Sequence, residues 1–312
     1  LGDRRAFLIW DTLAGYSNVN AIYFNLKRRL QWGLQGYDQR TYFIGVSEFG
    51  ELESTQRFSR ETGVNVLGVY PFSRYARAEG SFGYLSRSID AAYIVTNIDG
   101  TQGTIFLPRK DDTIQATAGL SYDGTRFKSF GPHGGQAISA SYRYMPDFTD
   151  GGTLSQDLVI EARAYVPITR RTNLAFRAFG AISTGDVPTV YAFGGLDNLR
   201  GYDYRTVIGN RIAYLNTEFR FPLIDALVTG SGLNFAGVRG RVFFDIGGAR
   251  LNGEEVTWYD DGQLVDAKAS WGFGLTAYFL GVPWNFDFAR PTNLKSNLDD
   301  WQFTFYIGPG SF

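Results

Sequence analysis

A strict two-residue alternation that follows a long loop is the feature that most constrains this chain. Residues 209–221 divide into two faces, with Ile212, Tyr214, Asn216, Glu218 and Arg220 on one and Ala213, Leu215, Thr217, Phe219 and Phe221 on the other. Successive side chains of a strand point to opposite sides, so this pattern predicts a strand with one apolar and one polar face. The preceding loop is rich in glycine and aromatic residues and carries Leu199-Arg200-Gly201-Tyr202 at its centre. We therefore expect the chain to build a closed barrel around an arginine-bearing loop.

Strand-like segments recur along the whole chain, and no convincing helix lies between them. They fall near residues 4–14, 19–32, 39–50, 60–70, 76–96, 113–123, 135–146, 155–166, 171–183, 209–221, 239–249, 269–280, 284–290 and 301–309. No linker, charge block or low-complexity tract divides the chain, and no fixed repeat length indicates propeller blades. The sequence predicts an all-β, antiparallel barrel of about fourteen strands that occupies residues 1–312 as one domain.

Composition excludes several classes of function. The 312 residues contain no cysteine and one histidine, His133, which excludes disulfides, thiolate or multi-histidine metal sites and most catalytic triads. The formal net charge of −1 gives no basis for binding nucleic acid. We find no run of about 18 apolar residues that predicts a spanning helix. Barrel strands average to a soluble-looking mean hydropathy, here −0.17, so the composition is compatible with a membrane barrel.

The connections between the segments are of two kinds. Short connections contain proline, which cannot donate to a ladder and marks a strand end: Tyr70-Pro71-Phe72, Val166-Pro167-Ile168, Phe221-Pro222-Leu223 and Val282-Pro283-Trp284. Long polar connections occupy residues 97–112, 147–152, 183–207, 251–267 and 291–300. From Tyr70 onward the two kinds largely alternate, except at residues 122–134, where a glycine-containing connection replaces a short turn. Short turns at one rim and long loops at the other are typical of transmembrane outer-membrane barrels.

Several segments, in this order, carry a resemblance to a known family. They are Tyr122-Asp123 with Gly131-Pro132 and Gly134-Gly135, Tyr165-Val166-Pro167-Ile168, Phe193-Gly194-Gly195 with Leu199-Arg200-Gly201-Tyr202, and Phe243-Phe244-Asp245-Ile246-Gly247. Together they resemble the C-terminal barrel of the BamA/TamA family, the bacterial surface antigen family of outer-membrane assembly and translocation proteins. The end of the chain resembles a barrel assembly signal, carried by Phe303, Phe305, Ile307 and Phe312.

The resemblance implies roles for particular residues. In the family, the arginine loop folds back into the lumen and meets a glutamate and an aspartate on the next two strands, here Arg200, Glu218 and Asp245. The alternation agrees, because Glu218 lies on the polar face of its strand and Asp245 alternates with apolar residues. A carboxylate buried in a narrow lumen is costly without a cation, and an arginine fork can serve two carboxylates. The alternative is that Arg200 is a solvated loop residue.

The resemblance also implies sixteen strands, two more than the segments counted here. Leu1-Gly2-Asp3 resembles the turn that enters the third strand in relatives with an upstream TolB-like propeller, so the first hairpin is expected to be absent. POTRA or propeller domains are expected upstream of this chain. The implied location is the outer membrane of a Gram-negative bacterium. The implied partners are outer-membrane lipids, client proteins and accessory lipoproteins.

Four functions remain open from the sequence. The favoured one is a protein assembly and insertion factor, without enzymatic activity or cofactor, that uses a weak seam between its first and last strands. The alternatives are a secretion pore of the same family, a porin or receptor, and a soluble all-β protein.

Other polar features are expected to be structural. The acidic pairs Asp111-Asp112, Asp260-Asp261 and Asp299-Asp300 are expected in solvated loops. His133 is expected in a turn. Alternation is expected to place Lys27 and Arg29 on the face opposite Arg28.

Overall fold

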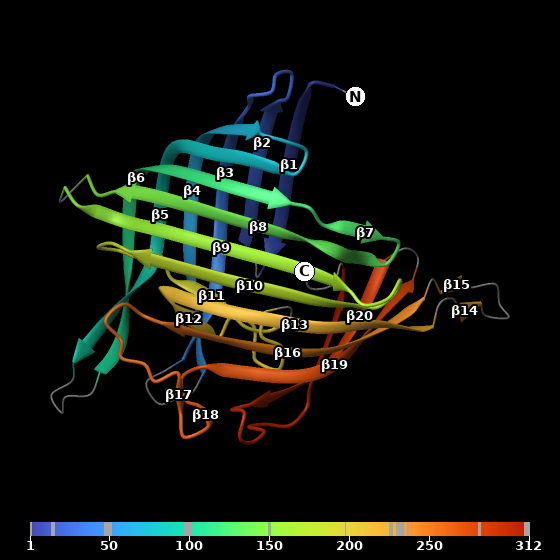
Figure 1. Ribbon diagram of the computed structural model, residues 1–312. Coiled ribbons are helices and arrows are strands. Elements are labelled where there is room, and N and C mark those ends of the chain that lie inside the picture. The colour runs from blue at the N-terminus through green and yellow to red at the C-terminus, as the bar shows by residue number, and fades with distance from the viewer. Residues whose placement is uncertain are drawn as a thin grey trace.

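The computed structural model describes residues 2–13, 16–46, 52–96, 102–148, 151–196, 198–224, 227–228, 234–235, 237–279 and 282–308. Its main element is one antiparallel sheet in which strands follow one another in chain order (Figure 1). The strands in that order are β1 (Arg4–Leu13), β2 (Tyr16–Asn25), β3 (Gln31–Val46), β4 (Leu52–Pro71), β5 (Ala76–Thr96), β6 (Gln102–Asp123), β8 (Gly131–Pro146), β9 (Thr153–Pro167), β10 (Asn173–Thr184), β13 (Arg211–Ile224), β16 (Val238–Arg250), β19 (Lys268–Phe279), β20 (Val282–Thr292) and β21 (Gln302–Ile307). The predictions of an all-β fold and of about fourteen antiparallel strands are confirmed.

Seven short strands decorate this sheet. β7 (Arg126–Lys128) pairs with β8, and three small hairpins are formed by β11 (Tyr191–Phe193) with β12 (Val207–Gly209), β14 (Leu227–Val228) with β15 (Asn234–Phe235), and β17 (Tyr259–Asp260) with β18 (Gln263–Leu264). No helix that is long and apolar enough to cross a membrane occurs among the described residues.

The sheet is twisted and is not closed. Figure 1 shows β1 to β3 running steeply across the direction of β8 to β13, as a right-handed strand twist accumulated over many strands produces. Within the described residues, β1 pairs only with β2 and β21 pairs only with β20. The expected closure into a barrel is therefore not present, and the sheet keeps two edges.

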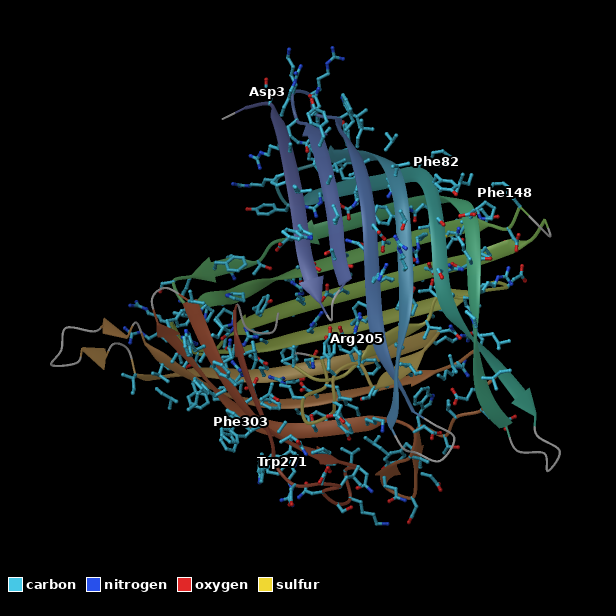
Figure 2. The ribbon with its side chains drawn as sticks, turned by 180° about the vertical axis from the view of Figure 1, so that it is seen from behind. Asp3, Phe82, Phe148, Arg205, Trp271 and Phe303 are labelled. Carbon is cyan, nitrogen blue, oxygen red and sulfur yellow. The ribbon has the colours of Figure 1, made fainter. Side chains whose placement is uncertain are left out.

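The two faces of the sheet differ in polarity. We call the face on which the loop between β10 and β13 packs the inner face. On β13 the inner residues Asn216 and Glu218 are at most 1% exposed, whereas Leu215 and Phe219 on the other side are 41% and 39% exposed. An exposed apolar face opposite a polar, covered face is the pattern of a transmembrane β-sheet. Figure 2 shows the side chains along both faces of the sheet.

The last strand carries three of the residues expected to form the C-terminal signal. Phe303, Phe305 and Ile307 are 56%, 43% and 53% exposed on the outer face. Two of them pack on β20, because the Phe303 and Phe288 ring centroids lie 5.0 Å apart and those of Phe305 and Phe286 lie 5.2 Å apart. Phe312 lies outside the described residues.

Several expected boundaries are wrong. Residues 97–112 were expected to form a loop, but β6 begins at Gln102 and pairs with β5 along its whole length. Asp111 therefore lies in a strand, where its side chain is 11% exposed and bonds to Arg109 at 2.8 Å. Where a strand extends beyond the part of the sheet that has an apolar outer face, its residues are polar on both faces. Polar and apolar residues then no longer alternate, so the sequence resembles that of a loop.

The basic residues near position 28 also differ from expectation. Lys27, Arg28 and Arg29 lie in the turn between β2 and β3 and not in a strand, so alternation does not set their faces. The Asn25 side chain accepts a hydrogen bond from the Lys27 backbone N–H at 3.1 Å, which stabilises this turn. The connection after Pro222 is likewise longer than the expected short turn, because β14 and β15 form a hairpin within it.

Candidate functional site

The loop between β10 and β13 folds back over the inner face of the sheet. β11 and β12 form its stem, and the backbone N–H of Gly195 donates to the carbonyl of Leu199 at 3.0 Å across its tip. Gly194 and Gly195 have φ angles of +126° and +74°, which side chains rarely adopt, and a Cβ on Gly194 would lie 2.7 Å from the Asp203 carbonyl oxygen. These two glycines therefore allow the tight turn that brings residues 198–202 to the sheet.

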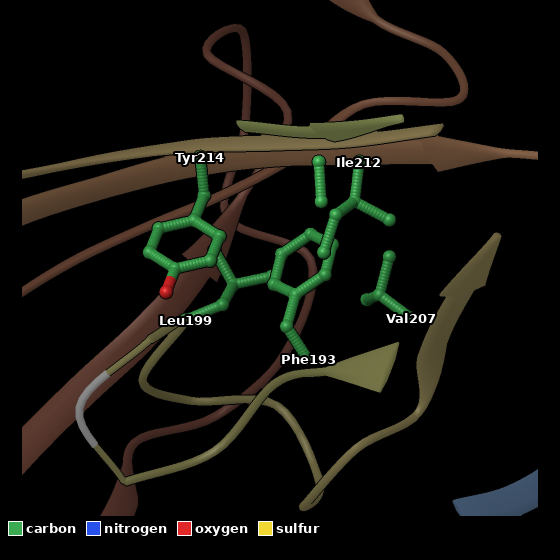
Figure 3. Packing of buried hydrophobic residues seen from close by; sticks show 6 residues of the cluster. Phe193, Leu199, Val207, Ile212 and Tyr214 are labelled. Carbon is green, nitrogen blue, oxygen red and sulfur yellow. The ribbon is translucent and has the colours of Figure 1, made fainter. Parts of the chain in front are cut away.

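An apolar cluster holds the stem of the loop in place. Figure 3 shows Phe193, Leu199 and Val207 of the loop packing against Ile212 and Tyr214 of β13. Leu199 is completely buried, and the Phe193 and Tyr214 ring centroids are 5.2 Å apart. Burial of this cluster fixes the position of the next residue, Arg200.

Arg200 joins the loop to two neighbouring strands. Its Nε and Nη2 donate to the two carboxylate oxygens of Asp245 on β16, each at 2.7 Å, and its backbone N–H donates to Asp245 Oδ2 at 3.2 Å. Its Nη1 donates to Glu218 Oε1 on β13 at 2.6 Å. The three side chains are at most 1% exposed. The structure thus brings together the loop arginine and the two carboxylates, in a bidentate geometry that favours arginine over lysine.

Further side chains complete the cluster around Arg200. Arg220 Nε donates to the second oxygen of Glu218 at 2.7 Å, and Asn216 Nδ2 donates to Asp245 Oδ1 at 2.9 Å. The Phe243 ring lies under the guanidinium, with Cζ 3.5 Å from its centroid. Both carboxylates therefore have a second donor, and the flat face of the cation is covered by an aromatic ring.

Burial and charge act in opposite directions on Arg200. Burial alone lowers the pKa of the guanidinium, but the charges of Asp245 and Glu218 outweigh it and raise the pKa well above its ordinary value. The two carboxylates therefore favour the charged form of Arg200. Next to it, burial raises the pKa of Tyr202 to about 12, so its hydroxyl remains a donor to the Ala269 carbonyl at 3.0 Å.

Gly201 allows the loop to touch the strand beyond. Its φ is +83°, and a Cβ there would lie 3.2 Å from the Ala289 Cβ and 3.3 Å from the Pro291 Cδ on β20. The Leu199–Tyr202 segment thus contacts β13, β16, β19 and β20 within four residues.

A second anchor holds the beginning of the same loop to other strands. Arg87 on β5 is 1% exposed, and its Nη2 donates to the Val187 carbonyl at 2.9 Å. Arg143 on β8 donates to Asp157 at 2.7 Å and to the Thr189 hydroxyl at 3.3 Å. The apolar side of this anchor is a buried cluster of Leu85, Ile89, Met145, Leu154 and Val187. The loop is therefore held to both halves of the sheet.

The sequence did not predict this second anchor, nor three of the side chains around Arg200. Arg87 and Arg143 occupy inner positions of alternating strands, and an arginine at an inner position is the signal that could have indicated them. Phe243, Asn216 and Arg220 could not be assigned, because alternation gives the face of a side chain and not its neighbours.

The other polar residues singled out in the sequence make structural contacts among the described residues. His133 is 5% exposed at the start of β8, and its Nε2 lies 3.0 Å from the Thr169 carbonyl oxygen. Asp261 lies in an exposed turn and pairs with Lys295 at 3.1 Å. Within the described part of the chain, no three His, Asp or Glu side chains are grouped closely enough to hold a metal ion.

A fourteen-strand antiparallel sheet with an exposed apolar face and a polar face covered by an inserted loop has the pattern of an outer-membrane β-barrel, although its two edges do not pair among the described residues. Residues 18–312 match the model of the Omp85 superfamily domain, and the chain belongs to this superfamily. The predicted resemblance to BamA-type barrels is confirmed at the level of family and fold. The propeller-bearing subgroup stays a prediction.

Three solved structures share this fold at low sequence identity. BamA from Haemophilus ducreyi lacking POTRA domains 1-3 matches with a TM-score of 0.67 at 14% identity, over 94% of this chain and 62% of that chain. CdiB from Acinetobacter baumannii matches with a TM-score of 0.53 at 12% identity, over 93% of this chain and 49% of that one. CdiB from Escherichia coli matches with a TM-score of 0.52 at 15% identity, over 93% and 52%. The chain thus spans about half to three fifths of their lengths. No curated protein matches the sequence.

Proposed function

We propose that this chain is the membrane barrel of an outer-membrane factor that inserts client polypeptides, in the manner of a BamA-like assembly protein, without bond-making chemistry. The observation that carries the proposal is the match of residues 18–312 to the Omp85 superfamily domain, in a sheet whose edges β1 and β21 have no partner strand within the described residues. Membership of the Omp85 superfamily and the fold shared with BamA support it.

The β1 edge has the properties of a template for another strand. Its ten residues present backbone donors and acceptors along the whole strand, and a long, apolar, unpaired edge attracts further strands. Phe7, Leu8, Ile9 and Trp10 are 48%, 72%, 55% and 69% exposed, so both faces of the edge are apolar. An incoming strand would gain a hydrogen-bonded ladder and apolar contacts together, as in β-augmentation.

The loop that carries Arg200 supports this function by fixing the rest of the sheet. Arg87 and Arg200 attach it to strands from β5 to β20, so the curvature of that part does not depend on pairing between the edges. The edges can then exchange partners while the remaining strands stay in place.

Disulfide crosslinking tests the proposal directly, because residues 1–312 contain no cysteine. A protein of residues 1–312, in which β1 and β21 are the sheet edges, would carry Leu8→Cys on β1 together with Phe303→Cys or Phe305→Cys on β21. We expect the oxidised, crosslinked protein in liposomes to lose insertion of an unfolded barrel client and the reduced protein to retain it.

The matched control joins β1 to its own partner. Leu8 lies directly opposite Ala21, so Leu8→Cys with Ala21→Cys crosslinks two strands that are already paired. That variant is expected to insert clients in both redox states. Insertion at the parental rate by the crosslinked β1–β21 protein would refute the proposal.

A secretion pore is the second candidate, and the fold shared with CdiB favours it. Export requires a passage through or beside the inner face, which the Arg200 loop crosses. If the β1–β21 crosslink leaves client insertion intact but release of a passenger depends on Arg200, export is the better account. A porin would show steady single-channel conductance with the loop in place.

A further inference from the structure

A chamber lies on the inner face between the Arg200 cluster and one rim of the sheet. It has a volume of about 550 Å³, within the usual range of ligand pockets. Glu218 and Arg220 border it on the side of the Arg200 cluster, and Phe127 and Phe130 border it at the rim.

The segment that contains β7 covers the chamber at the rim. Tyr278 on β19 donates its hydroxyl to the Phe130 carbonyl at 3.2 Å, a contact between residues 148 positions apart. The Arg239 guanidinium on β16 stacks on the Phe130 ring, with Cζ 3.9 Å from the centroid. The chamber is therefore partly enclosed by the loop on one side and by this segment on the other.

The wall of the chamber carries more cations than carboxylates. Its lining contains five arginines and one glutamate, namely Arg163, Arg177, Arg220, Arg239 and Arg241 with Glu218. Arg220 pairs with Glu218 at 2.7 Å, and Arg241 pairs with Asp287 on β20 at 2.6 Å. Arg163 lies directly opposite Arg177 on β10, and Arg220 lies directly opposite Arg241 on β16. Like charges at directly opposite positions destabilise a sheet, and this repulsion is offset only in part here, because three carboxylates, Glu161, Glu218 and Asp287, accompany the five arginines.

Nearby carboxylates are shared between these arginines. Glu161 accepts from Arg163 at 2.9 Å and from Arg177 at 2.7 Å, so one negative charge serves two cations. Arg239 donates to the Arg171 backbone carbonyl at 2.8 Å and makes no ion pair with a carboxylate among the described residues. The Arg163 side chain is 38% exposed and can turn toward a ligand in the chamber.

We propose that this chamber binds a phosphate group, held by Arg163 and Arg239 with the other arginines of the wall. A phosphate dianion matches several convergent guanidiniums better than a single carboxylate does, because it carries more charge and three or more acceptor oxygens. The site is separate from β1 and β21, so it stands or falls independently of the proposed insertion function. The phosphate can come from a free phosphate compound or from a lipid headgroup.

Isothermal titration calorimetry on the folded protein in octyl glucoside, without phosphate in the buffer, tests the site. The probes are inorganic phosphate, with chloride at equal ionic strength as the control, and micelles doped with phosphatidic acid, with diacylglycerol as the control. We expect saturable binding that Arg163→Gln and Arg239→Gln each weaken at least about tenfold. Arg60→Gln, an exposed arginine of β4 paired with Asp38, is expected to leave it unchanged.

The outcomes separate the two sources of phosphate. Binding of inorganic phosphate supports a site for free phosphate compounds, and arginine-dependent binding of phosphatidic acid alone supports a headgroup site. Absence of both, or equal binding by the parent and both chamber variants, overturns the proposal. If the variants do not fold, arginine modification of the parent protein by phenylglyoxal replaces them, with mass spectrometry as the readout. The probe that binds is expected to protect Arg163 and Arg239 from modification but not Arg60. Lack of this protection also overturns the proposal.

Discussion

Replacing Arg200 by alanine is the sharpest test of the cluster that holds the loop. The change removes two side-chain hydrogen bonds to Asp245 and one to Glu218, at sites that are at most 1% exposed. Glu218 keeps Arg220, whereas Asp245 keeps only neutral donors among those described above, the Asn216 amide and the backbone N–H of residue 200. Breaking a buried ion pair by removing one partner costs about 3–5 kcal/mol, mainly because a charge is left uncompensated. We expect Arg200→Ala to destabilise the folded protein by about that amount.

The unequal contacts predict unequal coupling. In double-mutant cycles, Arg200→Ala with Asp245→Ala should show a coupling free energy of about 2–3 kcal/mol, and Arg200→Ala with Glu218→Ala about 1 kcal/mol. The reason is that Asp245 takes both ends of the arginine fork, while Arg220 still neutralises Glu218 after Arg200 is removed.

Equilibrium urea unfolding in detergent measures these values. The six tryptophans report the transition by fluorescence, and heat-modifiable gel mobility reports the folded fraction independently. Arg60→Ala is the control, because Arg60 and Asp38 are 43% and 33% exposed and such a pair contributes at most about 1 kcal/mol. If Arg200→Ala costs no more than Arg60→Ala, or if the two couplings are equal, the reasoning from burial and bidentate geometry is wrong.

Two further predictions concern the same loop. Gly201→Ala should lower the free energy of unfolding by about 1–3 kcal/mol, because a side chain at φ +83° is strained and its Cβ would press on Ala289. The control is Gly262→Ala, where φ is +79° but nothing lies within 4 Å of the added Cβ, so that variant measures the backbone strain alone. Equal urea midpoints for the two variants would show that the contact with Ala289 contributes nothing. Arg87→Met should release the beginning of the loop from the Val187 carbonyl. We therefore expect proteinase K to cleave residues 185–190 faster in this variant than in the parent or in the control Arg60→Met. An unchanged cleavage rate would show that Arg87 does not hold the loop.

The sequence predicted the sheet well because one physical rule governs it. A strand with lipid on one side and a polar interior on the other must alternate, as residues 211–221 do, and this rule holds for every strand regardless of tertiary detail. It fails where a strand leaves the apolar band. There, Asp111 and its neighbours on β6 are polar on both sides and resemble a loop.

The candidate site was predictable only in part. Predicting Arg200, Glu218 and Asp245 as partners depended on family resemblance combined with alternation. Alternation alone shows that a side chain lies on the inner face, but it does not show at which height along the barrel axis the side chain lies. Phe243 under the guanidinium could not be expected, since an aromatic side chain at an inner position departs from the polar pattern. Arg87 was missed because Asp111, which lies directly opposite it on β6 with 3.9 Å between Nη2 and Oδ2, was expected in a loop. Its other partner, the Val187 carbonyl, has no signature in the sequence.

The two anchors of the loop explain why a sheet with unpaired edges can keep its shape. An apolar loop tip would be free to slide along the inner face, but the Arg200 fork fits only where Asp245 and Glu218 present their oxygens at one register. With Arg87 fixing the other end at β5, the loop links strands on both sides of the sheet centre. Among the described residues, neither anchor includes a residue of β1 or β21, so the contacts that hold the loop and the edges proposed to accept another strand are separate parts of the molecule. A client strand that pairs with β1 would therefore add to the sheet without competing with the contacts that hold it.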